Sequence, residues 1–147
     1  MAINQKKADV QDSDRRSATY ENSRRQGYIF DRVQRIVLDL SKNEKDNESI
    51  LDAGCGTERL LRKAKEHWPD AWLIGVAPAE GMIQQATQLL SDAEFHVTMV
   101  ESLPLPNASV DLVFSTLSFH HWSDQAKGVT EIRVFCVRKE VCCWRIL

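Results

Sequence analysis

The sequence predicts an α/β protein in which a doubly wound, mostly parallel sheet of four to five strands lies between helices. Short apolar runs alternate with segments whose apolar residues recur every three or four positions, the pattern of strands connected by helices. The run at residues 110–117 is almost continuously apolar, as expected of a parallel strand that is covered on both faces. A length of 147 residues fits a single domain.

The first half of the chain contains two expected helices and two expected strands. Apolar residues at helical spacing predict a helix over residues 22–40, and the apolar run at residues 49–53 predicts a buried strand. The helix after this strand must end near Trp68, because Pro69 follows and cannot continue it. Residues 72–76 are expected to form the second strand.

The second half repeats the alternation. A helix is expected over residues 82–90, then strands at 95–100 and 110–117, then a last helix capped by Ser123. The final residues, 141–147, are apolar enough for a fifth strand, but the sequence leaves open whether they pair. If they do not, the fourth strand becomes a hydrophobic edge through which the protein could self-associate.

Composition gives no support to a nucleic-acid or membrane partner. Lys and Arg total 19 against 21 Asp and Glu, a net charge of −2, so no general attraction to nucleic acid or membrane is expected. A cytoplasmic protein is expected, because neither a secretory signal nor a membrane-spanning run is present. Cys55, Cys136, Cys142 and Cys143 lack metal-binding spacing and are expected to be thiols. Residues 1–19 are polar and are expected to be a disordered or frayed leader.

A pair of glycines marks the candidate site. Gly54 and Gly56 follow the first strand and precede a helix, so backbone N–H groups and the positive end of a helix dipole meet at one place. Such a turn suits an anionic or zwitterionic small molecule. A nicotinamide dehydrogenase is a weaker interpretation, because Arg59 occupies the place of that fingerprint's third glycine.

Five motifs in register carry a family resemblance. They are Leu-Asp-Ala-Gly-Cys-Gly-Thr at 51–57, Val-Ala-Pro with Glu-Gly-Met at 76–82, Glu-Ser-Leu-Pro-Leu-Pro at 101–106, Ser-Val-Asp-Leu-Val at 109–113 and Ser-Phe-His-His-Trp at 118–122. Together they resemble the class I S-adenosylmethionine-dependent methyltransferases of the type 11 group. The resemblance implies a Rossmann-like methyltransferase fold in one domain over residues 20–147, with S-adenosyl-L-methionine as cofactor and a small-molecule methyl acceptor.

The resemblance also implies site residues. An acid at Asp52 contacts the cofactor's ammonium group, the turn of Gly54 and Gly56 approaches its methionine part, and Met82 forms a wall for the adenine ring. Histidine at the end of the fourth strand suggests His121 as a general base. The remaining expected cofactor-binding residues are Cys55, Ala77, Val100, Glu101 and Ser115.

The chain also departs from the family pattern. Ala77 stands where an acid usually holds both ribose hydroxyls, and Met99 stands where a polar residue often faces the adenine. Glu58 replaces a third glycine, and its side chain is expected to fill the approach of the cofactor. From Val134 onward the family continuation is missing, so a product truncated at its C-terminal strands is expected. The alternative function is therefore an impaired or inactive homologue that acts as a binding or regulatory partner.

Overall fold

A computed structural model describes residues 24–43, 47–137 and 143–146, so the expected leader at residues 1–19 lies outside the described residues. It contains one parallel five-stranded sheet with strand order β3-β2-β1-β4-β5, which confirms the predicted fold class. The strands are β1 (Ser49–Ala53), β2 (Trp72–Ala77), β3 (Glu94–Val97), β4 (Leu112–Ser115) and β5 (Cys143–Ile146). β1 is the central strand, between β2 and β4, and all five of its residues are buried.

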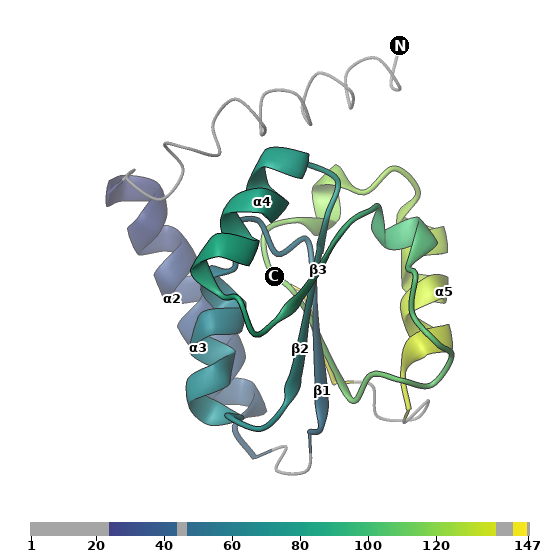
Figure 1. The fold of residues 1–147 in the computed structure, drawn as a ribbon, viewed down its shortest axis with the longest axis horizontal. Coiled ribbons are helices and arrows are strands. Elements are labelled where there is room, and N and C mark those ends of the chain that lie inside the picture. Colours follow the sequence, from purple (N-terminus) through teal and green to yellow (C-terminus); the bar gives the residue numbers. More distant parts are fainter. Residues whose placement is uncertain (1–23, 44–46, 138–142, 147) are drawn as a thin grey trace.

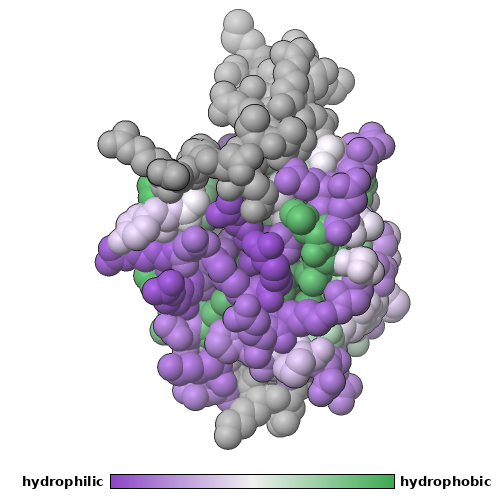
Figure 2. All heavy atoms as spheres, turned by 60° about the vertical axis from the view of Figure 1, so that its left-hand side comes forward, coloured by the Kyte–Doolittle hydropathy of each residue, from purple (hydrophilic) through white to green (hydrophobic). Residues whose placement is uncertain are grey.

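Helices cover both faces of the sheet (Figure 1). α2 (Arg24–Ser41), α3 (Arg59–His67) and α4 (Glu80–Leu89) pack on one face, and α5 (Gln125–Phe135) packs on the other. Each face has its own apolar core: Leu61 and Phe114 belong to the first, Ile74 and Ile132 to the second. Figure 2 shows that the outer surface on the α2 side is mostly hydrophilic, with narrow hydrophobic patches. No helix in the described ranges is long and apolar enough to span a bilayer.

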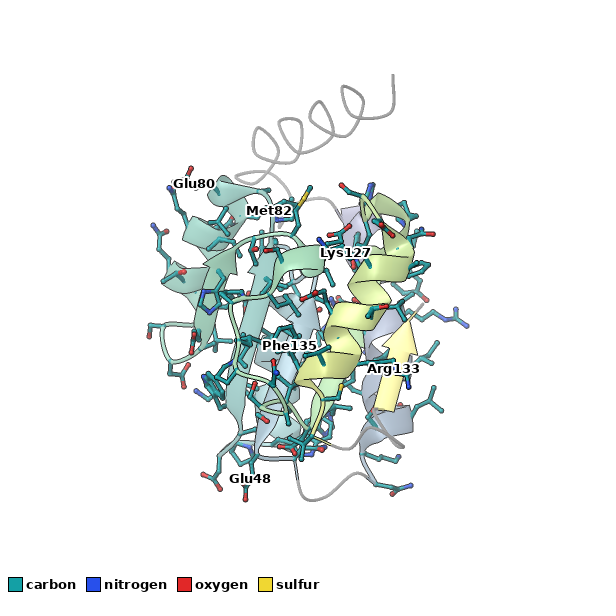
Figure 3. All side chains as sticks on the ribbon, turned by 90° about the vertical axis from the view of Figure 1, so that its right-hand side faces the viewer. Glu48, Glu80, Met82, Lys127, Arg133 and Phe135 are labelled. Carbon is teal, nitrogen blue, oxygen red and sulfur yellow. The ribbon has the colours of Figure 1, made fainter. Side chains whose placement is uncertain are left out.

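Asp111 fixes the start of the central strand. Its Oδ2 accepts hydrogen bonds from the backbone N–H groups of Glu48 and Ser49, both at 3.0 Å, and from the Ser49 hydroxyl at 2.8 Å. These bonds join β1 to β4 at the amino ends of the strands. Figure 3 shows Glu48 at this end and Met82 at the opposite end, where the carboxyl ends of the strands lie.

Two predicted strands are shorter than expected. β3 ends at Val97 because its partner β2 ends at Ala77, and the chain then turns into a short 3₁₀ helix, η1 (Val100–Ser102). β4 ends at Ser115, and Leu117 has a φ of 56°, which no strand residue adopts. The length of an apolar run thus overestimates the length of a strand when the neighbouring strand ends first.

The start of α5 corrects another expectation. Asp124, not Ser123, is the N-cap, because its side chain accepts a hydrogen bond of 2.9 Å from the backbone N–H of Lys127. The backbone N–H of Asp124 in turn donates to Glu101 Oε1 at 2.7 Å. This contact between residues far apart in sequence selects one of two adjacent capping residues.

The last described segment settles the open question about the fifth strand. β5 pairs in parallel with β4, with Val113 opposite Trp144, so the fourth strand is not the exposed edge that would favour self-association. The expectation of free thiols is wrong at Cys136, which is buried and disulfide-bonded. Cys55 is a free buried thiol, as expected.

Candidate cofactor site

A cavity of about 180 Å³ opens at the carboxyl ends of β1, β2 and β4. This is the edge of a doubly wound sheet where ligands bind, and strand order reverses there between β1 and β4. Nine of the ten predicted site residues line the cavity; they are Asp52, Gly54, Cys55, Gly56, Ala77, Met82, Val100, Glu101 and His121. The sheet topology therefore brings together residues that are separated by up to 69 positions in the chain.

Asp52 is a buried acidic residue that lines the cavity. It lies in β1, is 1% exposed, and its Oδ1 has no hydrogen-bond partner among the described residues. Burial raises the pKa of Asp52 from 3.8 to about 7. A buried carboxylate oxygen left without a donor is costly, so the site suits a ligand that brings a positively charged donor.

The glycine turn brings backbone close to the cavity. Gly54 has a φ of 95°, and its N–H and that of Cys55 donate to Val76 O at 2.9 and 3.0 Å. Gly56 has a φ of 55°, and a β-carbon there would meet no atom within 4 Å. The turn is thus tied to β2 on one side and open on the other, which leaves room for a ligand against Gly56. The pKa of the Cys55 thiol is raised far above its usual range by burial and then by the nearby Asp52 carboxyl.

Ser115 is the predicted site residue that the cavity does not include. Its hydroxyl lies 2.8 Å from that of Ser118, which donates to Ala53 O at 2.8 Å. Ser118 has one hydroxyl proton, so Ser115 is the donor between the two. Ser115 therefore holds Ser118 in place, and Ser118 lines the cavity.

His121 lies at the mouth of the cavity. It ends the 3₁₀ helix η2 (Phe119–His121), and its exposed ring stacks obliquely on that of His120, with centroids 3.9 Å apart. The next residue, Trp122, is buried and packs edge-on against Phe119 at 4.9 Å. The buried Trp122 anchors the segment that carries the exposed histidines.

Glu58 does not fill the cavity as expected. Its side chain is fully buried and is not among the lining residues, and its Oε1 lies 3.8 Å from Nη1 of Arg62 one turn along α3. Its backbone adopts φ 80° and ψ 0°. This left-handed conformation explains why a glycine suits this position: the turn, rather than the ligand, requires it.

This conformation predicts an inverted order of stability. Of two variants that both remove the carboxylate, Glu58→Gly should be more stable than Glu58→Ala by about 1 kcal/mol, since only alanine keeps a β-carbon at positive φ. Urea unfolding of both variants measures the difference. The control is the same pair at Glu66, inside α3, where alanine should be the more stable by about 1 kcal/mol. Equal stability of the two Glu58 variants would contradict the strain.

Several lining residues were not predicted. Thr116, Leu117 and Ser118 follow β4, and the rule that ligands bind at the carboxyl ends of strands would have found them. Phe30 and Gln34 come from α2, which precedes the sheet, and no local signal in the sequence indicates that this helix reaches the site.

Comparison with known proteins identifies the family. A family model described as a methyltransferase domain matches residues 51–137, more than half of the chain. The chain belongs to this methyltransferase family. The match begins in β1 and includes every strand end that borders the cavity. The cofactor implied by the family is S-adenosyl-L-methionine.

Curated relatives of this methyltransferase domain include two malonyl-[acyl-carrier protein] O-methyltransferases. The protein from Acetivibrio thermocellus is 35% identical over 98 residues, which cover 65% of this chain and 34% of that protein. The protein from Ilyobacter polytropus is 31% identical over 133 residues, which cover 86% of this chain and 47% of that protein. The matches thus span less than half of either relative.

Solved structures agree on the fold. A protein from Anabaena variabilis, assigned to the methyltransferases of an antibiotic biosynthesis pathway, is 30% identical with a TM-score of 0.61 over 71% of this chain and 42% of that one. The YcgJ protein of Bacillus subtilis is 24% identical, with a TM-score of 0.61 over 69% of this chain and 46% of that one, and shares the fold. In both cases the match spans less than half of the solved chain.

Proposed function

We propose that the cavity binds S-adenosyl-L-methionine and that the protein transfers its methyl group to a small-molecule acceptor. The observation that carries the proposal is the buried carboxyl of Asp52, a residue that lines a cavity at the switch point of the sheet and whose Oδ1 has no partner in the described part of the chain. The family match supports the same ligand independently of this geometry.

The residues present fit this cofactor. Asp52 offers a carboxylate for the ammonium group, and the open space against Gly56 would take the amino-acid part. Met82, which is 7% exposed, and Val100 supply apolar walls for the adenine ring. When bound, the cofactor supplies an electrophilic methyl group on a sulfonium ion.

The chain's contribution to the reaction is chiefly placement. A cavity that holds two reactants in line replaces a bimolecular encounter by a reaction within one complex. This effect lowers the activation barrier by up to about 7–11 kcal/mol in favourable cases. His121 stands at the mouth with an exposed ring, where it would accept a proton from an acceptor that carries one on the reacting atom; an ionised carboxylate acceptor would need no such base. The relatives named malonyl-[acyl-carrier protein] O-methyltransferases make a malonyl group the first acceptor to try, presented on acyl carrier protein as in the names of those relatives.

Calorimetric titration with S-adenosylhomocysteine tests the proposal. We expect a submillimolar dissociation constant, and weaker binding of adenosine, which lacks the amino-acid part that Asp52 and Gly56 would contact. Transfer of labelled methyl groups to malonyl-acyl carrier protein would then identify an acceptor. Absence of binding at millimolar concentration would contradict the proposal and favour the alternative, an inactive homologue that acts as a binding or regulatory partner.

A further inference from the structure

The cavity has a polar side and an apolar side. Polar side chains reach it from α2, from β1 and the turn and helix start that follow it, from η1 and from the segment after β4: Gln34, Asp52, Thr57, Arg59, Glu101, Thr116, Ser118, His121 and Ser123. The residues contributed by the end of β2 and the start of α4 are Val76, Ala77, Pro78, Ala79 and Met82. None of these five carries a side-chain hydrogen-bond donor or a strong acceptor.

The end of β2 is where a doubly wound fold recognises ribose. In nucleotide-binding folds of this type, an acid about 20 residues after the glycine turn accepts hydrogen bonds from a ribose hydroxyl. Ala77 is the last residue of β2, is 4% exposed and lines the cavity. The position therefore presents a methyl group where a carboxylate would hold the sugar.

The two carboxylates that line the cavity come from elements other than the end of β2. Asp52 lies in β1, on the polar side. Glu101 follows β3, and its Oε1 already accepts the 2.7 Å hydrogen bond from the backbone N–H of Asp124 that fixes the start of α5. Among the residues that the structure describes, no third carboxylate lines the cavity.

We propose that this site binds its nucleoside without side-chain hydrogen bonds to the ribose hydroxyls. It therefore also accepts nucleosides that are altered or deoxygenated at the 2′ and 3′ positions. The inference rests on the proposed function, since it assumes a nucleoside in the cavity. Specificity then comes from the amino-acid end, at Asp52, and from the adenine end. Hydroxyls placed against Ala77 and Met82 lose water without gaining a side-chain partner, so their removal costs no affinity.

The test compares two ligands on the wild-type protein, on one variant and on a control variant. S-adenosylhomocysteine and its 2′,3′-dideoxy analogue are titrated calorimetrically into the wild-type protein and into Ala77→Asp. The wild type should bind both within about threefold, or the analogue more tightly. Ala77→Asp should bind S-adenosylhomocysteine at least about tenfold more tightly than the analogue, because a carboxylate restores charge-assisted hydrogen bonds. Asn107→Asp adds the same charge in an exposed loop beyond the cavity and should leave the wild-type ratio unchanged.

The outcomes separate this inference from the function on which it rests. Wild-type preference for S-adenosylhomocysteine by tenfold or more overturns the inference and leaves the proposed function standing. Binding of S-adenosylhomocysteine by Ala77→Asp but not by the wild type also overturns the inference. That result would mean that binding requires the carboxylate that the wild type lacks at position 77. Absence of binding by both proteins overturns the proposed function itself.

Discussion

Replacing Asp52 by asparagine should weaken the binding of S-adenosylhomocysteine about 10- to 100-fold at pH 8. The variant keeps the shape of the side chain and loses the negative charge that faces the ligand's ammonium group, and a charge-assisted hydrogen bond contributes about 1.5–3 kcal/mol. Titration of both proteins at pH 8 and pH 5.5 measures the effect. The wild-type advantage should shrink at pH 5.5, because a carboxyl with a pKa of about 7 is then protonated.

The same carboxyl should make the ligand-free protein less stable as the pH rises. The folded protein retains a proton that the unfolded chain releases at its pKa of 3.8, so stability falls between about pH 4 and pH 7 and is level above. The difference of about three pKa units corresponds to a loss of about 4 kcal/mol. Asp52→Asn should lack this loss and be the more stable protein at pH 8. A wild-type protein that gains stability over this range by more than the variant would contradict the burial argument.

Replacing Gly54 by alanine should destabilise the fold by about 3 kcal/mol or more. The β-carbon would lie 2.3 Å from the Ser118 hydroxyl oxygen at a φ of 95°, so steric overlap adds to backbone strain. Ser118 cannot move aside cheaply, because its hydroxyl is bonded to Ser115 and to the carbonyl of Ala53. Urea unfolding measures the loss.

A double variant separates the two causes. Gly54→Ala combined with Ser118→Gly removes the overlap and leaves the strain, so Gly54→Ala should cost only about 1–2 kcal/mol when measured against Ser118→Gly alone. If the cost of Gly54→Ala were the same with and without the Ser118 side chain, the close approach of the two residues would not be its cause.

Local signals in the sequence were sufficient for most of the fold. The bounds of β1 and the end of α3 before Pro69 follow from an apolar run and a helix breaker, and both are confirmed. The wrong predictions concern element boundaries that are set by a residue far away in the sequence. β3 stops with its partner at Ala77, and the cap of α5 is chosen by Glu101, so neither boundary is written in the segment itself.

The site shows the same division. The residues after β1 and β2 were predictable from the turn and the family motifs, whereas Gln34 and Phe30 reach the cavity only because α2 packs beside α3. Glu58 was misinterpreted because the sequence shows its charge and size and not its backbone conformation. The roles of the predicted site residues remain predictions.

The proposed function requires a nucleoside in the cavity with its charged amino group on Asp52. A crystal structure of the protein with S-adenosylhomocysteine tests this most directly. We predict the ligand between Gly56 and Met82, with its ammonium nitrogen within hydrogen-bond distance of Oδ1 of Asp52 and its ribose hydroxyls making no side-chain hydrogen bond at the end of β2. A ligand bound elsewhere, or one whose amino group points away from Asp52, would contradict it.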